Sequence, residues 1–127
     1  ANAETNMLYL VGVSKSCGQG MHIVDVSNPL EPTFVACFSD DGYTHDAQCV
    51  TYRGADTEYY ESEICFCYNE DTVTIVDVTD KGNMTILSRT SYDEDSYTHQ
   101  GWLSTDQSYV VFGDEYDEIT NTDITNT

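Results

Sequence analysis

Two short motifs occur twice in this chain at nearly the same spacing, and this internal repeat constrains the fold more than any other feature. The sequence Ile-Val-Asp-Val at residues 23–26 returns at residues 75–78, an offset of 52 residues. The sequence Tyr-Thr-His at residues 43–45 returns at residues 97–99, an offset of 54 residues. Periods of about 40 to 50 residues that consist of short strands are typical of propeller blades. The repeat therefore predicts a β-rich supersecondary unit that is copied in tandem.

Strand signals dominate the sequence. Short runs of Val, Ile, Thr, Tyr and Phe are bounded by Gly, Asn, Asp and Pro, a pattern that indicates strands, and no window has a useful amphipathic helical period. One complete unit of four strands runs from residue 45 to about residue 96. The unit before it lacks the first strand, and the unit after it stops after the second. The predicted strands cover residues 8–13, 21–26, 33–38, 45–52, 63–68, 73–78, 84–90, 100–103 and 109–113.

The predicted fold is all-β: a fragment of a β-propeller with about two and a half four-stranded antiparallel blades. Propellers typically close with about 4 to 8 blades, whereas 127 residues hold roughly 2.4 units of 52 residues. We therefore expect a longer polypeptide, of which residues 1–118 form the partial propeller. Residues 119–127 (ITNTDITNT) are polar and of low complexity, and we expect them to be a truncated loop.

The charge of the chain restricts its partners. The net charge is −19, from 23 acidic and 4 basic residues. Contacts to phosphate groups need Lys and Arg, so we expect no nucleic-acid partner, and an anionic membrane surface is disfavoured for the same reason. No apolar run is long enough to span a bilayer, so we expect no direct membrane insertion in this segment. Cations, cationic partners and neutral ligands such as sugars remain, beside the simpler interpretation that the acidity keeps a secreted protein soluble.

The cysteines and one sequon predict an extracellular or cell-surface location. Five cysteines favour disulfides in an oxidising compartment, because their spacing lacks the paired C-x-x-C motifs of a zinc ribbon. An odd number leaves at least one of them free or paired outside this segment, and we assign no partner to Cys17, Cys37 or Cys67. Asn83-Met84-Thr85 is a glycosylation sequon in a predicted turn, which makes Asn83 a candidate glycosylation site.

Polar side chains gather at one end of the predicted blades, where the connection between units and the hairpin between the second and third strands both emerge. Carboxylates in this position suit Ca²⁺, and two histidines close to carboxylates suit Zn²⁺ or another transition ion. Turn Asp and Asn residues also commonly bond only their own backbone, so a purely structural role stays open. The candidate metal ligands are His45, Asp46, Glu70, Asp71, His99, Asp114 and Glu115.

No catalytic constellation is evident. The sequence has no G-x-S-x-G elbow, P-loop or Rossmann fingerprint, and we predict no catalytic residue. For Asp25 and Asp77, the acidic residues of the repeated motif, we expect a structural role as acceptors of backbone N–H groups in the turn that follows. Trp102 and the tyrosines near the first strands are expected to fill space between blades.

The repeated segments resemble a known family. MHIVDVSNPLEPTFV and VTIVDVTDKGNMTIL resemble LVIVD repeats, in which an Ile-Val-Asp-Val strand precedes a Ser/Thr-Asn/Asp-Pro turn. The stretch that begins HDAQCVTYRGADTEYYESEICFCYNED resembles the choice-of-anchor B family of secreted and surface proteins, over about residues 7–118. This resemblance implies an extracellular or surface-anchored β-propeller with no established catalytic chemistry. It also points to a Cys49–Cys65 disulfide, a pairing that agrees with counting inward along the antiparallel hairpin from Tyr52 and Glu63.

Together these patterns predict a non-enzymatic extracellular or cell-surface β-propeller module that binds a protein or glycan, with Ca²⁺ as its candidate cofactor. The alternative is a metal-dependent hydrolase that uses the histidines and carboxylates at the mouth of the central channel, an analogy drawn from other propellers alone. A third hypothesis is a structural scaffold inside a larger surface protein.

Overall fold

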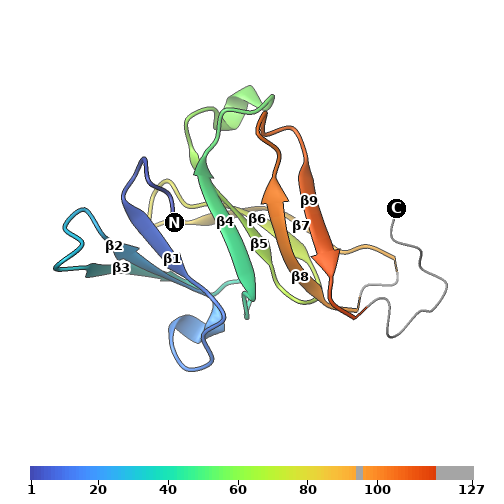
Figure 1. Cartoon of the computed structure of the whole chain (residues 1–127), viewed down its shortest axis with the longest axis horizontal. Coiled ribbons are helices and arrows are strands. Elements are labelled where there is room, and N and C mark those ends of the chain that lie inside the picture. Colours follow the sequence, from blue (N-terminus) through green and yellow to red (C-terminus); the bar gives the residue numbers. More distant parts are fainter. Residues whose placement is uncertain (94–95, 117–127) are drawn as a thin grey trace.

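The structure, a computed structural model, describes residues 1–93 and 96–116; the predicted loop at residues 119–127 lies outside the described residues. Nine strands form three antiparallel sheets with the orders β1-β2-β3, β4-β5-β6-β7 and β8-β9 (Figure 1). Within the described residues the helical elements are two short 3₁₀ turns, η1 (Cys17–Gln19) and η2 (Thr57–Tyr59). The strands are β1 (Met7–Leu10), β2 (Met21–Asp25), β3 (Thr33–Phe38), β4 (Asp46–Thr51), β5 (Glu63–Tyr68), β6 (Val73–Asp77), β7 (Thr85–Thr90), β8 (Thr98–Leu103) and β9 (Val110–Asp114).

The all-β class and the division into units are confirmed. Every predicted strand is present, with ends that differ from the prediction by at most three residues. The first sheet has three strands, the second has four and the third has two, as expected for an incomplete unit, a complete unit and a second incomplete unit. None of these sheets closes on itself among the described residues, so a closed propeller stays a prediction.

The two Ile-Val-Asp-Val strands, β2 and β6, are structural equivalents. Each is the last strand but one of its sheet. Each also has a register shift with the following strand after its isoleucine, between Ile23 and Val24 in β2 and between Ile75 and Val76 in β6. The expected role of the acidic residue is confirmed. The carboxylate of Asp25 accepts a hydrogen bond from the backbone N–H of Ser27 at 2.7 Å, and that of Asp77 accepts one from Thr79 at 2.9 Å.

The apolar core lies between sheets. The first sheet contributes Tyr9, Met21, Ile23 and Phe38, which pack with the cysteines and valines on one face of the second sheet. The opposite face of the second sheet, including Tyr68, packs with Leu103 of the third. A β-carbon on Gly101 would lie 2.5 Å from the ring of the fully buried Tyr68, so glycine is what allows β8 to approach so closely.

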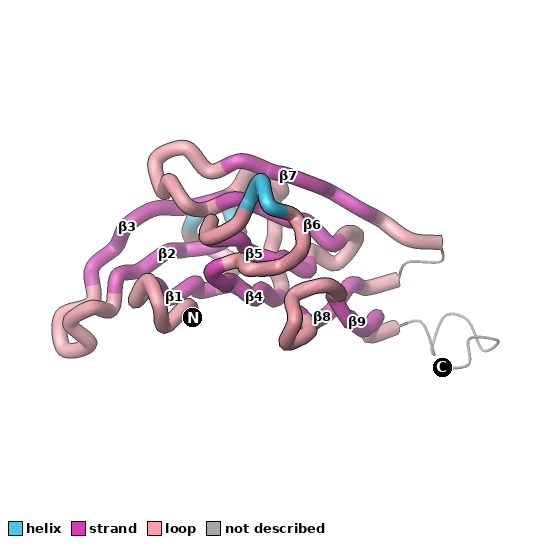
Figure 2. The backbone as a smooth tube through the Cα atoms, turned by 90° about the horizontal axis from the view of Figure 1, so that it is seen from above, coloured by secondary structure: helices cyan, strands magenta, loops and turns pink. Residues whose placement is uncertain are grey.

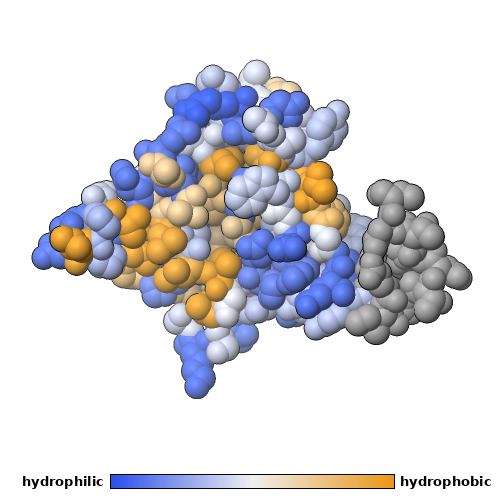
Figure 3. All heavy atoms as spheres, in the orientation of Figure 1, coloured by the Kyte–Doolittle hydropathy of each residue, from blue (hydrophilic) through white to orange (hydrophobic). Residues whose placement is uncertain are grey.

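The outer sheets each leave apolar side chains exposed. Phe34 of the first sheet is 61% exposed, and Figure 3 shows apolar atoms gathered over this part of the molecule. In the third sheet, Trp102 is 68% exposed and Val111, its partner across the ladder, is 70% exposed. None of the described residues covers that face, so the expectation that Trp102 fills space between blades stays a prediction.

Two cysteine pairs lie at disulfide distance. Cys49 and Cys65 stand directly opposite each other in the β4–β5 ladder, with an S–S distance of 1.96 Å. The ladder differs by one residue from the one counted from the sequence, because Glu63 faces Thr51 rather than Tyr52. Cys17 and Cys37, for which no pairing was predicted, form the second disulfide and tie η1 to β3. Cys67 is buried and is not disulfide-bonded.

A buried carboxylate joins the first two units at the end opposite the Tyr-Thr-His motifs. Glu63 accepts hydrogen bonds from the side chains of Asn2 at 2.9 Å and Thr5 at 2.6 Å, both in the segment that leads into β1. The ammonium group of Lys81 lies 2.8 Å from the other oxygen of this carboxylate. Burial alone would raise the pKa of Glu63, but the hydrogen bonds from Lys81, Thr5 and their neighbours outweigh it and lower the pKa.

Lys81→Met should destabilise the protein by about 3 to 5 kcal/mol at pH 7, because it leaves the Glu63 carboxylate buried without a cation. The lowered pKa of Glu63 means that its stabilising contribution is present above about pH 4.5 and is lost as the pH falls. The deficit of the variant should therefore shrink when the carboxyl group is protonated. Urea unfolding at pH 7 and pH 4 measures both effects.

Arg53→Met is the matched control. The ion pairs of Arg53 with Glu4 and Glu61 are exposed, at side-chain exposures of 41% to 60%, so this substitution should change the free energy of unfolding little. If the two variants lost equal free energy of unfolding, burial of Glu63 would not strengthen the contribution of its ion pair with Lys81, and this account would be contradicted.

Candidate functional site

The two Tyr-Thr-His motifs, 54 residues apart in the sequence, come together in the structure. Each lies at the start of the first strand of its unit, β4 or β8. The Nδ1 atom of His45 is 2.9 Å from the carbonyl oxygen of His99, and the two imidazole rings have centroids 4.7 Å apart. Because a carbonyl oxygen only accepts hydrogen bonds, Nδ1 of His45 carries a proton and donates it. The motif therefore links adjacent units directly.

The threonine of each motif fixes the junction through its backbone. Both Thr44 and Thr98 are fully buried. The N–H of Thr44 donates to the carbonyl oxygen of Gln19 at 3.2 Å, and its own carbonyl accepts from Gly12 at 2.8 Å. In the next unit, Thr98 exchanges two backbone hydrogen bonds with Glu70, at 2.5 and 3.2 Å. The backbone of each threonine is thus hydrogen-bonded to the preceding unit. Because every junction between units needs this contact, the Tyr-Thr-His motif recurs with the repeat.

The rings around these threonines form one aromatic cluster. Tyr97 lies 5.3 Å from His45, 6.1 Å from His99 and 5.1 Å from Tyr116, measured between ring centroids. Tyr43 adds a ring 6.2 Å from His45. These separations and the tilted or edge-on ring planes are those that aromatic pairs favour. We call this set the Tyr-His cluster: Tyr43, His45, Tyr97, His99 and Tyr116.

Two glutamates border the Tyr-His cluster. An Oε2 atom of Glu115 is 3.8 Å from Nε2 of His99. Burial, together with the nearby carboxylate of Glu70, raises the pKa of the Tyr97 phenol. Both glutamates are exposed to solvent. The cluster therefore presents ring surfaces, phenol groups and negative charge at the same end of the sheets.

Asp114, a predicted metal ligand, has a structural role in this region. Burial would raise its pKa, but the hydrogen bonds it accepts lower the pKa to about 2. Its carboxylate holds the connection between β7 and β8 in place beside the Tyr-His cluster. The donors are the phenol of Tyr92 at 2.5 Å and the backbone N–H groups of Ser96 at 2.7 Å, Tyr97 at 2.8 Å and Tyr116 at 2.9 Å.

The remaining predicted ligands divide between the cluster and other contacts. Four of them belong to the cluster or its border: His45, His99, Glu70 and Glu115. The carboxylate of Asp71 instead forms an ion pair with the guanidinium of Arg89, at an N–O distance of 3.0 Å. Asp46 lies opposite Tyr68 in the β4–β5 ladder. Among the residues that the structure describes, no three His, Cys, Asp or Glu side chains are placed to hold one metal ion. The Ca²⁺ expected from the sequence stays a prediction without a defined ligand set.

Two contributors to this end of the molecule were not among the candidate ligands predicted from the sequence. The side chain of Asp41, 7% exposed, accepts hydrogen bonds from Asn69 at 2.7 Å, Thr74 at 2.5 Å and Arg89 at 2.5 Å. It ties the connection before β4 to strands of the second sheet, but nothing in the sequence ranks it above the neighbouring acidic residues. The second contributor is the tyrosine set. The signal for Tyr43 and Tyr97 was the repeat itself, whereas Tyr116 has no counterpart in it.

Residues 17–40, which span η1, β2 and β3, match the family model of the LVIVD repeat. The chain therefore carries an LVIVD repeat, as its resemblance predicted, and this match indicates a repeat-type module. No curated protein and no solved structure matches the chain. Among the described residues, no helix has the length and apolar character needed to cross a membrane.

Asp114→Ala should lower stability by roughly 2 kcal/mol at neutral pH, the equivalent of the difference between a pKa of 3.8 and one of about 2. A lowered carboxyl pKa stabilises the folded state above about pH 4, and this contribution is lost as the pH falls toward 2. The difference between wild type and variant should therefore shrink over that range. Urea unfolding from pH 7 to pH 2.5 measures it. Asp40→Ala, which removes an exposed carboxylate from the corresponding connection, should change little; a difference at Asp114 that does not vary with pH would contradict this account.

Proposed function

We propose that this chain is part of a non-enzymatic extracellular or cell-surface β-propeller module that binds a protein or glycan through the Tyr-His cluster. The observation that supports this most is that both copies of the repeated motif place their rings at one end. There Tyr116 is exposed and Glu70 and Glu115 lie at the border.

The chemistry of the cluster suits recognition rather than turnover. A tyrosine combines a large apolar ring with a polar hydroxyl group, which is why it is enriched at binding interfaces. The ring faces can contact the apolar side of a sugar or a Lys or Arg cation, and cations are held over aromatic faces within about 6 Å. Carboxylates such as Glu70 and Glu115 accept hydrogen bonds from sugar hydroxyls and pair with cations. Among protein ligands, the net charge of −19 favours a basic one, because it steers positive partners to the surface.

The extracellular location is supported by the two cysteine pairs at disulfide distance, since disulfides persist in oxidising compartments. Asn83 of the glycosylation sequon is exposed in the turn between β6 and β7, where its N–H donates to the carbonyl oxygen of Asp80 at 3.0 Å. A glycan on Asn83 would therefore meet no steric obstacle from the buried core.

The metal-dependent hydrolase is not supported by a specific observation. His45 uses Nδ1 to bond the next unit, Asp114 is occupied by four donors, and the described residues include no group of three metal ligands. The binding proposal does not depend on Ca²⁺, and calorimetry with this ion would test the cofactor prediction separately.

Tyr116→Ala should weaken ligand binding at least fivefold, because a tyrosine at the centre of an interface typically contributes more than about 1 kcal/mol. The measurement is binding of the chain to an immobilised glycan panel and to a panel of Lys- and Arg-rich peptides, followed by affinity determination for any hit. Affinity for a basic peptide should fall steeply in 0.5 M salt, whereas affinity for a neutral glycan should not.

Tyr109→Ala is the matched control. Tyr109 is 71% exposed but stands at the other end of the β8–β9 hairpin, next to Ser104, so its loss should leave binding unchanged. Failure to bind either panel, or equal losses in the two tyrosine variants, would contradict the assignment of the cluster as the binding surface.

A further inference from the structure

The two disulfides of the molecule have different surroundings. Cys37, on β3, is exposed to solvent, and its partner Cys17, in η1, is half-buried. In the other pair, Cys49 is 4% exposed and Cys65 is fully buried. The remaining cysteine, Cys67, is buried as well, and burial raises the pKa of its thiol, so it stays protonated and unreactive. A thiol in solution can therefore reach the first disulfide and not the second.

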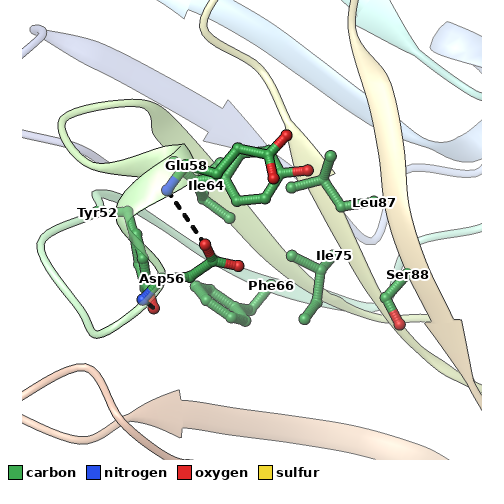
Figure 4. Close-up of a pocket in the computed structure, with 9 residues that line it drawn as sticks. Tyr52, Asp56, Glu58, Ile64, Phe66, Ile75, Leu87 and Ser88 are labelled. Atoms are coloured by element: carbon green, nitrogen blue, oxygen red, sulfur yellow. Dashed lines mark hydrogen bonds between the residues drawn. The ribbon is translucent and has the colours of Figure 1, made fainter.

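The pocket on the second sheet opens no path to the buried disulfide. It has a volume of about 390 Å³, and its lining includes Ile64, Phe66 and Ile75 (Figure 4). Alternate residues of a strand point to opposite faces, so Cys65, which stands between Ile64 and Phe66 in β5, points away from the pocket. Its side chain lies in the core between the first and second sheets.

The internal repeat shows that the position of Cys37 stays accessible when another unit packs against its face. Strands β3 and β7 are the last strands of their sheets and lie along the same edge of the molecule (Figure 2). Cys37 stands opposite His22 in the β2–β3 ladder. The corresponding pair of the second unit is Arg89 opposite Thr74. Arg89 shares its face with Val76, which is buried against the first unit, and its side chain is still 49% exposed.

The exposed disulfide holds a loop that is longer than the repeat needs. The connection before the Ile-Val-Asp-Val strand spans residues 69–72 in the second unit but residues 11–20, here called the η1 loop, in the first. In the second unit Glu70 alone makes both backbone hydrogen bonds to Thr98. A junction between units therefore forms without the extra length and without a disulfide.

The η1 loop contacts the Tyr-Thr-His motif of the next unit at two points. The N–H of Gly12 donates to the carbonyl oxygen of Thr44 at 2.8 Å, and the N–H of Thr44 donates to that of Gln19 at 3.2 Å. Cys17 lies between these two points, and its disulfide to Cys37 fixes the loop to β3. Because Gln19 is two residues from Cys17, the disulfide also fixes the acceptor of the Thr44 N–H group.

Two residues of the η1 loop hold a backbone conformation that residues with a side chain rarely adopt. Cys17 has a φ of 50° and Gln19 a φ of 72°, both in the left-handed region. Conformations of this kind persist when the surrounding contacts enforce them. At Cys17 one of these contacts is the disulfide to β3, so the loop can relax once the disulfide opens.

We propose that the Cys17–Cys37 disulfide is a thiol-exchange site, at which a thiol from solution opens the disulfide and releases the η1 loop from β3 and from Thr44. A thiolate attacks Sγ of Cys37 and forms a mixed disulfide, and Cys17 leaves as a thiolate that takes a proton from water. A second thiolate attacks the sulfur of the first thiol in the mixed disulfide and frees Cys37, which is protonated in turn. Two thiols are thus oxidised to one disulfide while the two cysteines are reduced. The proposal does not depend on binding at the Tyr-His cluster.

The first test measures how fast each disulfide opens in the folded 127-residue chain. The chain is incubated with millimolar reduced glutathione, and free thiols are trapped with iodoacetamide and assigned by peptide mass spectrometry. Alkylation of Cys17 and Cys37 should be at least a hundredfold faster than that of Cys49 and Cys65. A parallel reaction with reduced thioredoxin distinguishes a protein dithiol from a small thiol as the preferred reductant.

A single-cysteine variant tests the sulfur that is attacked. In Cys17→Ser, Cys37 loses its partner and stays exposed, so oxidised glutathione should add one glutathione to it. Cys67 should remain unmodified under the same conditions, because it is buried.

The second test measures the release of the loop by hydrogen exchange. After reduction the amide of Thr44 should exchange at least tenfold faster, because the carbonyl group of Gln19 moves away from it. The amide of Thr98 is the internal control: its partner Glu70 belongs to the junction without an extended loop, so its rate should not change. The double variant Cys17→Ser, Cys37→Ser should reproduce the fast exchange at Thr44 without any reductant.

Three results would overturn the proposal. If both disulfides opened at the same rate, the exposed pair would not be a preferred exchange site. If exchange at Thr44 stayed slow after Cys17 and Cys37 were reduced, the loop would be held by its other contacts and the disulfide would release nothing. If Thr44 and Thr98 were accelerated equally, reduction would loosen the whole chain rather than the η1 loop.

Discussion

Each sheet of this chain can bury its apolar faces only against a neighbouring sheet, and the other features of the structure depend on this constraint. A two- to four-stranded sheet has no core of its own, so units of this kind gain stability mainly at their junctions. The first junction buries Ile23 and Met21 completely. Within residues 1–93 and 96–116 the outer sheets lack a neighbour on one side, and Phe34 and Trp102 are exposed there. The side chains of these two residues are as apolar as those in the core. They are exposed because they lie on the outer faces of the first and third sheets.

Polar contacts at the two ends of the sheets fix how neighbouring units sit against each other. At one end Glu63 joins the segment before β1 to the second unit. At the other end the backbone of Thr44 and Thr98 bonds the preceding unit, and His45 bonds the following one. Apolar burial is non-directional, whereas hydrogen bonds of this kind have a fixed geometry. The junction therefore needs both, and the recurrence of Tyr-Thr-His with the repeat reflects that need.

The positions of the strands could be predicted from the sequence, because strand-forming residues and the turn residues beside them lie next to each other in the chain. Strands β3 and β5 have the predicted bounds, since each is a short run of apolar and β-branched residues with proline, serine or asparagine at its borders. Contacts between distant segments have no such signal. The Cys17–Cys37 disulfide depends on how η1 folds back on β3, and three donors of Asp114 come from the connection between β7 and β8, 17 to 22 residues earlier in the chain. Asp46, Asp71 and Asp114 share one end of the sheets, as predicted, but shared location does not imply that their oxygens converge on one point.

The acidic residues illustrate this difference between location and convergence. Asp41 and Asp114 each accept hydrogen bonds from several donors, so they organise the connections between units. A carboxylate that already has its lone pairs occupied has little to offer a metal ion, which prefers several oxygens directed at a common centre. Glu70 and Glu115 differ because they are exposed beside the rings of Tyr97 and His99. Asp114 holds the backbone of Tyr97 and Tyr116 in place, whereas Glu70 and Glu115 give the Tyr-His cluster a negative border.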